Sequence, residues 1–407
     1  MALRIVAADP DPAVMSLPWS TPLEEWDDEF VIPLPRGLSR HVVRMVRPAQ
    51  HTYAVKETNA ELAFREYELL RRLQSLGLAT VRPKGVVTGR VDASGAELPA
   101  ALLSRYLRFS LSYRTLFAQG LSSVDNLPRL VDALVVLLVR LHLAGFYWGD
   151  VSLSNVLFRR NAGEFSAYLV DAETGELTEH LSDRMREHDV QVGCENVFAE
   201  IMDLQAGGEL DEAVEPDSVV ERIQERYDDL WAELTREEEF DADEMWRIER
   251  RIERLNDLGF DVDELDIAAE HDSDRLRIRP RVVALGHHAR ELEQVTGLDV
   301  EDNQARRLLN DLAAYTAHHG LGHEEREVVG QEWLTTVYQP IARMVPPEAR
   351  GKLEPAEVFH EVLVHRWFLS EEAGHEVDIF DSARSYLDNV LVTRPVEALD
   401  VRPAEKG

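Results

Sequence analysis

Four charged residues lie at the edges of apolar strands or helix stripes, where a charge without a partner is costly. They are Lys56 in Tyr-Ala-Val-Lys-Glu, Glu66 in the next helical stretch, Asp150 in Gly-Asp-Val-Ser-Leu-Ser-Asn and Asp171 in Tyr-Leu-Val-Asp-Ala. Asn155 follows Asp150 by five residues. These residue types, in this order, suit phosphoryl transfer that depends on ATP and Mg²⁺.

Each of these residues has a role that its chemistry suits. Lys56 can neutralise phosphate oxygens, and Glu66 can hold the lysine in place. Asp150 can orient an attacking hydroxyl and accept its proton. Asn155 and Asp171 offer the hard oxygen ligands that Mg²⁺ prefers. We therefore predict that Lys56 and Asp150 are catalytic, that Glu66 supports nucleotide binding, and that Asn155 and Asp171 bind the metal.

The expected phosphate-binding loop has one clear glycine, Gly37, followed by Ser39 and Arg40. We predict that these three residues bind the nucleotide together with Lys56, through backbone amides, a hydroxyl and two cations. Lysine is rare in this chain, because four lysines stand beside 40 arginines. Since the two cations are not equivalent at a compact charged site, Lys56 is the more informative.

Structural interpretations of the same residues remain open. Lys56 could extend from a strand end to water, and Glu66 could pair with Arg65 or Arg71 on the surface. Asp150 and Asn155 could simply be turn formers, and Asp171 could cap a following turn. The whole set could also belong to a pseudokinase-type regulator that binds nucleotide without consuming it, or to an enzyme that transfers a nucleotidyl group.

Periodicity predicts the elements that must position these residues. Residues 1–29 are rich in proline and in acidic residues, and we expect them to form a loosely ordered N-terminal lead-in. Strands are predicted over Phe30–Pro33, His41–Val46, Thr52–Glu57, Val81–Val91 and Pro99–Ser104. A helix is predicted over 59–76, capped by Asn59 and ended by Gly77. Its inward stripe would be Leu62, Glu66, Leu69, Leu73 and Leu76.

The remainder of the chain alternates between short strands and helices. An apolar helix is predicted over 127–144, then a loop over 147–155 and strands over 156–158 and 167–170. Further helices are predicted over 219–256, 282–296, 304–317, 330–345 and 355–372. Four aromatic residues of these later helices are expected in their core: Trp333, Tyr338, Trp367 and Phe368. His360 and His365 are five apart and diverge on a helix, which disfavours a metal site.

Charge and composition narrow the function classes. The 407 residues carry 44 basic and 76 acidic side chains, a net charge of −32. Residues 1–180 account for −2 (19 − 21) and residues 181–407 for −30 (25 − 55). This balance argues against nucleic-acid binding and against docking on anionic membranes. The acidic half is either a solvated helical surface or a docking face for a cationic protein partner.

The single cysteine, Cys194, excludes an intramolecular disulfide. The longest apolar run near the middle, residues 133–139, is too short to span a bilayer, and the N-terminal sequence lacks the apolar core of a signal peptide. We therefore expect a cytoplasmic protein without membrane insertion.

The order of strand lysine, helix glutamate, apolar helix, Asp-x₄-Asn loop and strand aspartate resembles the protein-kinase superfamily. Within it, LHLAGFYWGDVSLSNVLFRR and AYLVDAETGE resemble the lipopolysaccharide (Kdo-type) kinase-like branch. More narrowly, RRIERLNDLGFDVDEL, TGLDVEDNQARRLLNDL and FHEVLVHRWFLSE resemble an uncharacterised actinobacterial family with a domain of unknown function after that module. The resemblance implies an α+β, protein-kinase-like two-lobed fold over 21–210, a lead-in over 1–20 and a mainly α-helical acidic extension over 211–400.

Three departures from the kinase pattern bear on the acceptor. Trp148-Gly149 precedes Asp150 in place of His-Arg, Ala172-Glu173 follows Asp171 in place of Phe-Gly, and no Ala-Pro-Glu follows. The missing activation segment argues against a regulated protein kinase. We therefore expect the acceptor to be a hydroxyl of an unidentified, non-protein molecule such as a sugar-like metabolite.

Overall fold

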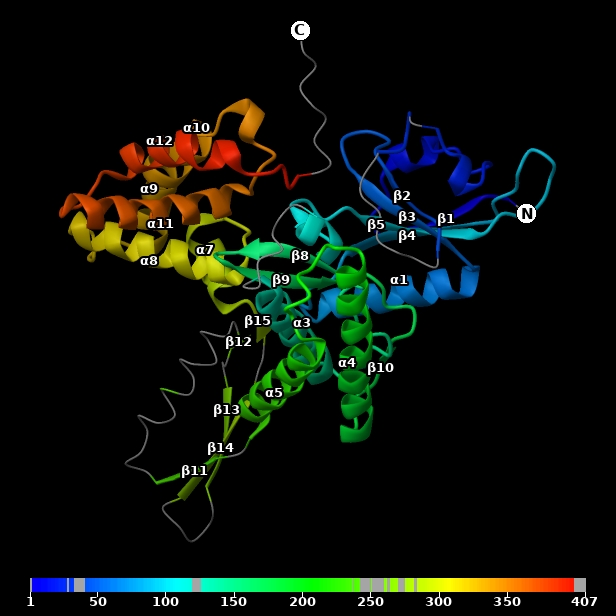
Figure 1. Ribbon diagram of the computed structural model, residues 1–407, viewed down its shortest axis with the longest axis horizontal. Coiled ribbons are helices and arrows are strands. Elements are labelled where there is room, and N and C mark those ends of the chain that lie inside the picture. The colour runs from blue at the N-terminus through cyan, green and yellow to red at the C-terminus, as the bar shows by residue number, and fades with distance from the viewer. Residues whose placement is uncertain are drawn as a thin grey trace. The chain divides into compact units, whose positions relative to one another are not determined.

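The computed structural model describes residues 2–27, 29–32, 41–118, 126–236, 238–241, 250, 260–261, 264–269, 275–281 and 284–398 (Figure 1). The chain divides into two compact units. The first is formed by Met1–Arg159 and Ala167–Tyr227, and the second by Arg160–Ser166 and Asp228–Ala398. The expected division of the chain at residues 20 and 210 remains a prediction.

The first unit contains a five-stranded antiparallel sheet in the order β1-β4-β5-β3-β2. The strands are β1 (Arg4–Val6), β2 (Val43–Val46), β3 (Tyr53–Thr58), β4 (Arg82–Thr88) and β5 (Ala100–Arg105). Side chains alternate between the two faces of a strand. In β3, Val55 is buried in the core formed with the N-terminal segment, while its neighbour Lys56 reaches the helix α1 (Ala60–Ser75).

Helix α1 begins and ends where the sequence predicts. The Asn59 side chain accepts a hydrogen bond from the Leu62 amide at 2.9 Å, and Gly77 has a φ of +75° just beyond the last turn. The predicted inward stripe is only partly right, because Leu76 is 51% exposed. Leu62 and Leu69 are half-buried. The buried face is turned by about one residue and consists of Ala63, Glu66, Tyr67, Leu70 and Leu73.

The expectation of a loosely ordered lead-in is wrong for the described residues. β1 pairs antiparallel with β4, and two 3₁₀ turns follow, η1 (Pro12–Ser16) and η2 (Leu23–Glu25). Trp19 and Trp26 are buried against the sheet with ring centroids 5.2 Å apart. The apolar residues here follow neither the helix nor the strand period, so periodicity could not reveal them. The expected strand at Phe30 is reduced to a bridge between Val31 and Val46.

The second lobe of this unit is built around a buried helix, α3 (Asn126–Leu143), close to the predicted span. A three-stranded sheet has the order β6-β8-β9, and β7 pairs with β10. The elements are α2 (Tyr113–Leu116), β6 (Ser110–Leu111), β7 (Phe146–Tyr147), β8 (Val156–Asn161), β9 (Glu164–Leu169), β10 (Glu176–Leu177), α4 (Asp183–Ala206) and α5 (Pro216–Thr235). The two predicted short strands are confirmed within β8 and β9.

The second unit is mainly helical around one apolar core. Its helices are α7 (His287–Thr296), α8 (Asp302–His318), α9 (Arg326–Trp333), a π-turn η4 (Leu334–Tyr338), α10 (Gln339–Met344), η5 (Pro347–Ala349), α11 (Pro355–Ala373), α12 (Ile379–Asn389) and η6 (Leu391–Thr393). The helices predicted over 304–317, 330–345 and 355–372 are confirmed, and the one over 282–296 begins later, at His287. α12 was not predicted.

The predicted helix over 219–256 is confirmed up to Thr235 and is wrong at Glu238–Asp241, while residues 242–249 and 251–256 lie outside the described residues. Glu238–Asp241 form a strand, β11, in a sheet of order β11-β14-β13 with β13 (Glu264–Ala269) and β14 (Arg275–Arg281). A further pair joins β12 (Phe260–Asp261) and β15 (Ala284–Leu285). The β13 and β14 sequences ELDIAA and RLRIRPR alternate apolar and charged residues, which is the strand period rather than the helix period.

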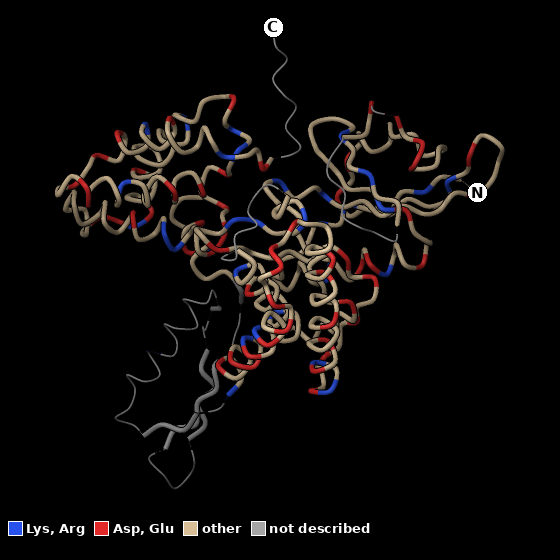
Figure 2. Tube along the Cα trace, viewed as in Figure 1, with Lys and Arg blue, Asp and Glu red and all other residues tan. Residues whose placement is uncertain are grey.

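Two of the four aromatic residues expected in the second core are there. Trp333 and Tyr338 are buried, whereas Trp367 and Phe368 are 59% and 57% exposed on α11, so that part of the prediction is wrong. Figure 2 shows acidic residues along α5 and along the helices of the second unit. Within the part of the chain that the structure describes, no helix has the length and apolar character needed to span a bilayer.

Candidate active site

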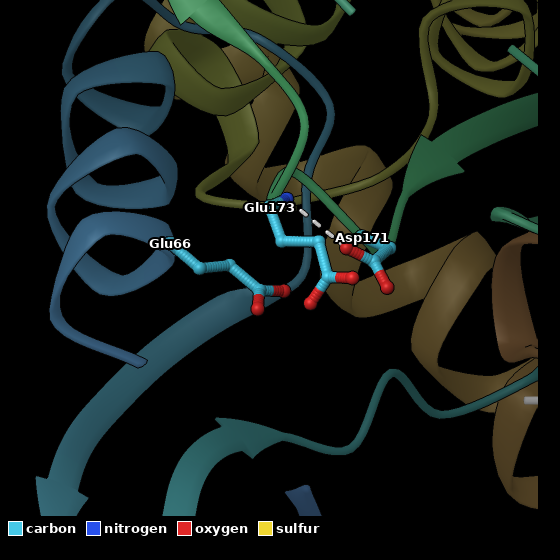
Figure 3. Close-up of side chains that lie close together, drawn as sticks. All are labelled: Glu66, Asp171 and Glu173. Carbon is cyan, nitrogen blue, oxygen red and sulfur yellow. Dashed lines mark hydrogen bonds between the residues drawn. The ribbon is translucent and has the colours of Figure 1, made fainter. Parts of the chain in front are cut away.

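Lys56 is the charged centre of a site in the first unit, and its three carboxylate partners, Glu66, Asp171 and Glu173, are drawn in Figure 3. Its Nζ lies 3.0 Å from Glu66 Oε2, 2.8 Å from Asp171 Oδ2 and 3.1 Å from Glu173 Oε2. Glu66 comes from α1, and the other two carboxylates come from the segment after β9. The structure therefore brings together three residues that the sequence singled out, and adds Glu173. Arg65, the alternative partner of Glu66, donates to the Gly175 carbonyl instead.

Burial and mutual charge perturb this cluster strongly. Burial raises the pKa of Glu66 to about 7, the Asp171 charge adds to the rise, and Lys56 opposes it. Burial alone would lower the pKa of Lys56, but Glu66, Asp171 and Glu173 outweigh burial and raise it. Burial likewise disfavours the Glu173 anion, yet Lys56 and the His41 ring outweigh that cost and lower the pKa of Glu173. Lys56 therefore remains a cation at neutral pH.

Asp171 joins this cluster to the loop before Asp150. Its Oδ1 accepts from the Glu173 amide at 3.0 Å, so it also caps the following turn, as one of the alternatives proposed. Its backbone carbonyl accepts from Trp148 Nε1 at 3.1 Å. The Thr174 hydroxyl donates back to the Trp148 carbonyl at 2.8 Å. The two loops are thus joined through both the side chain and the backbone carbonyl of Trp148.

Asn155 lies beside both Asp150 and the strand that leads to Asp171. Its Nδ2 donates to the Asp150 carbonyl at 2.9 Å and to Asp150 Oδ2 at 3.0 Å. The Asn155 carbonyl accepts from the Val170 amide at 3.0 Å, one residue before Asp171. With the amide nitrogen turned to Asp150, the side-chain oxygen of Asn155 is the atom that can bind a cation.

Helix α4 supplies positioning residues that the sequence analysis missed. The Asp189 carboxylate is fully buried and accepts from the amides of Trp148, at 2.6 Å, and Gly149, at 2.7 Å. Glu200 accepts from the amides of Leu153 and Ser154 and from the Ser154 hydroxyl. The loop that carries Asp150 is therefore held by a buried carboxylate at each end.

Between these anchors, Asn196 donates to the Val151 carbonyl at 2.9 Å and to Asp150 Oδ1 at 3.4 Å. Residues i, i+4, i+7 and i+11 share one face of a helix, and Asp189, Gly193, Asn196 and Glu200 have this spacing. A Cβ at Gly193 would lie 2.9 Å from Val151 Cγ1, so only glycine admits this approach. The spacing of polar residues around a glycine is the one sequence signal of this face, and it does not identify the loop that the face anchors.

A buried relay extends from Asp189 to α5. His142 Nε2 lies 3.2 Å from Asp189 Oδ2, and His142 Nδ1 lies 2.7 Å from the Tyr227 hydroxyl. Burial lowers the pKa of His142, against the opposing effect of Asp189. A neutral His142 can donate from Nε2 to Asp189 while it accepts from Tyr227.

The predicted nucleotide-binding residues Gly37, Ser39 and Arg40 lie outside the described residues. The chain is described again from His41, whose Nε2 lies 3.0 Å from Glu173 Oε2. Among the described residues, one group of three carboxylates has ligand atoms within 4.8 Å of one another, namely Glu66, Asp171 and Glu173. These residues fit a Mg²⁺-bound polyphosphate, because the hard carboxylate oxygens would bind the Mg²⁺ and the protonated lysine would offset negative charge on the phosphates.

The fold and this constellation define a protein-kinase-like module with a helical extension. Residues 39–192 match the model of the lipopolysaccharide kinase (Kdo/WaaP) family, and residues 229–391 match that of a domain of unknown function, DUF4032. The predicted resemblance to a lipopolysaccharide-kinase-like module followed by a domain of unknown function is thereby confirmed, as is the two-lobed α+β fold, whereas the actinobacterial origin remains a prediction. No curated protein matches the chain.

Among solved structures, one match is described as WaaP in complex with acyl carrier protein. It is 17% identical, covers 63% of this chain and 99% of that one, and has a TM-score of 0.37. At that TM-score the likeness supports no statement about this chain's function.

Proposed function

We propose that this protein is a Mg²⁺- and ATP-dependent phosphotransferase that acts on a hydroxyl of a non-protein acceptor. One observation carries the proposal, namely that the structure joins Lys56 to the Asp150 loop through Asp171. Lys56 Nζ contacts Glu66 and Asp171, and the Val170 amide, one residue before Asp171, donates to the Asn155 carbonyl of that loop. The match of residues 39–192 to a kinase family supports the same chemistry.

The roles of the residues follow from their positions. Lys56, kept protonated by its carboxylates, would bind phosphate oxygens, and Glu66 would hold it in place. Asp150 would accept the proton of the acceptor hydroxyl, oriented by Asn155 and by the anchors on α4. Asn155 and Asp171 would hold Mg²⁺, which would offset the charge on the phosphates. Gly37, Ser39 and Arg40 remain our candidates for the phosphate-binding loop.

We also propose that the acceptor is a small molecule and that the protein is cytoplasmic, since ATP and Mg²⁺ are abundant in the cytoplasm. No Ala-Pro-Glu follows Asp171, so the segment that places a peptide in protein kinases has no counterpart in the sequence. The acidic second half is proposed as a docking face for a cationic protein partner, whose binding would weaken steeply with salt.

Calorimetric titration with ATP, with and without Mg²⁺, tests the nucleotide site. We expect wild type to bind ATP more tightly with Mg²⁺, and Asp171→Ala to lose the Mg²⁺-dependent part. Asp183→Ala is the matched control, since Asp183 is an 85%-exposed aspartate at the start of α4. Mg²⁺-dependent binding that survives in Asp171→Ala would refute the metal assignment.

Turnover separates the proposal from its alternatives. A transferase consumes ATP in the presence of its acceptor, and Asp150→Asn abolishes this while ATP binding is retained; full transfer by that variant would refute the role of Asp150. A nucleotide-binding regulator binds ATP without consuming it. The mass added to the acceptor identifies the group, since phosphate adds about 80 Da and AMP adds about 329 Da.

A further inference from the structure

The β8–β9 hairpin carries the two predicted metal ligands at its base. β8 begins at Val156, directly after Asn155, and β9 ends at Leu169, two residues before Asp171. The Val170 amide donates to the Asn155 carbonyl at 3.0 Å and closes this base. The tip of the same hairpin, Arg160–Ser166, belongs to the second compact unit, with the helices of the extension.

Gln304, at the start of α8, binds the hairpin tip at Arg160 and Asn161. Its backbone amide donates to Asn161 Oδ1 at 3.1 Å, and its Nε2 donates to the Arg160 carbonyl at 3.1 Å. Asn161 Nδ2 in turn donates to the Ser166 hydroxyl at 2.9 Å, which ties the two strands together at the tip. Gln304 is fully buried, and the bond from its amide to Asn161 is shielded from water.

Glu357 of α11 also binds the hairpin tip. Its Oε2 accepts from the Ala162 amide at 3.0 Å and from Gln304 Nε2 at 2.8 Å, and its side chain is 2% exposed. The turn that it meets is tight, because Ala162 and Gly163 both have positive φ, +54° and +89°. A left-handed alanine is strained by about 1–2 kcal/mol, and the bond to Glu357 helps to hold it in that conformation.

A third contact fixes the side of the tip. Arg160 Nε lies 2.7 Å from Glu397 Oε1, and Glu397 is 2% exposed. The Arg160 guanidinium also lies 5.8 Å from the Phe165 ring centroid. Burying a polar group is costly unless it is paired. Gln304, Glu357 and Glu397 are all buried and all bind the hairpin tip, so together they form a preorganised binding site for it.

We propose that the helical extension acts as a clamp on the metal-binding hairpin, with Gln304 and Glu357 as its positioning residues. A two-stranded ribbon transmits the position of its tip to its base, because the strands are joined by hydrogen bonds along their length. Holding the tip therefore fixes the separation of Asn155 and Asp171. The function of the clamp in phosphoryl transfer rests on the proposed function; its effect on the hairpin base does not.

Amide hydrogen exchange tests the clamp without any ligand. Glu357→Ala leaves the Ala162 amide unpaired, and we expect exchange at the Val170 amide to accelerate about tenfold. Glu357→Gln keeps an acceptor oxygen and should restore most of the protection. The matched control is Asp311→Ala, which removes a half-buried carboxylate of the same unit that accepts from Trp333 Nε1 at 2.9 Å. The control should leave Val170 unchanged.

Metal dependence then tests the functional part. At saturating ATP, Glu357→Ala should weaken apparent Mg²⁺ affinity by about threefold to tenfold, a smaller loss than for groups bonded directly to a metal ligand. ATP binding without Mg²⁺ should be unchanged. If Glu357→Ala does not fold, Asn161→Ala removes the acceptor of the Gln304 amide from the hairpin side.

Unchanged Val170 exchange in Glu357→Ala, or an equal change in Asp311→Ala, overturns the clamp. Failure of the proposed function shows itself differently, as wild type that binds no Mg²⁺-ATP while the Val170 exchange still responds to Glu357→Ala. Altered exchange with unaltered Mg²⁺ affinity would keep the mechanical link and refute its role in metal binding.

Discussion

The burial of Glu66 makes a sharp prediction about stability and pH. Its pKa in the folded protein is about 7, against 4.5 for the unperturbed group. The folded state therefore binds more protons than the unfolded chain between these values. Stability from this group is fully present below pH 4.5 and is lost as the pH rises through about 7. A shift of 2.5 pH units (7 − 4.5) corresponds to about 3 kcal/mol.

Glu66→Gln removes this titration and keeps the shape of the side chain. We expect the free energy of unfolding of the variant, relative to wild type, to rise by about 2–3 kcal/mol between pH 5 and pH 8. Lys56 does not contribute to this slope, because it stays protonated throughout the range. Urea denaturation at pH 5, 6, 7 and 8 measures the difference.

Glu68→Gln is the matched control, since Glu68 is on the same helix but 62% exposed. Its stability should follow that of wild type at every pH. Parallel pH curves for wild type and Glu66→Gln would refute the reasoning, because they would mean that Glu66 titrates alike in the folded and unfolded chains. A carbon NMR titration of the Glu66 carboxyl would then locate its pKa directly.

Three further predictions concern other parts of the first unit. Asp189→Ala leaves the Trp148 and Gly149 amides unpaired, so ATP turnover should fall about 100-fold with ATP affinity unchanged in calorimetry. Arg90 is 1% exposed and pairs with Glu57; Arg90→Leu should lower the free energy of unfolding by about 3–5 kcal/mol in urea denaturation, and a loss near zero would refute the pairing. Burial raises the pKa of Cys194 to about 11, so a thiol reagent at pH 8 should modify it in urea but not in the native protein.

The sequence sufficed to predict the elements that have strong local signals. Single residues, Asn59 and Gly77, predict where helix α1 begins and ends, and an unbroken apolar period predicts helix α3. Lys56 and Asp171 are 115 residues apart in the sequence. Lys56 lies within an apolar strand and Asp171 follows one, and a charged residue is conspicuous in such a sequence. The sequence therefore predicts the strand context of each residue, but it does not predict that the two residues contact each other.

What could not be predicted depends on tertiary contacts. The N-terminal tryptophans pack on a sheet that forms from later residues, so nothing local announces their burial. Asp189 and Glu200 are ordinary acidic residues of an acidic helix until the Asp150 loop is placed against α4. Glu357 and Gln304 are likewise indistinguishable in sequence from the exposed polar residues of α11 and α8. Each acquires its meaning from a partner far along the chain.

The distribution of buried charge bears on the choice between a transferase and a nucleotide-binding regulator. Binding ATP alone needs a cation such as Lys56 and a metal ligand such as Asp171. It does not need the Asp150 loop to be fixed at both ends, yet Asp189 and Glu200 are buried carboxylates that serve mainly the amides of this loop. Burying a carboxylate is costly, and the loop that is ordered in this way carries Asp150 as well as Asn155. The arrangement therefore favours turnover, which is what the Asp150→Asn and Asp189→Ala variants measure.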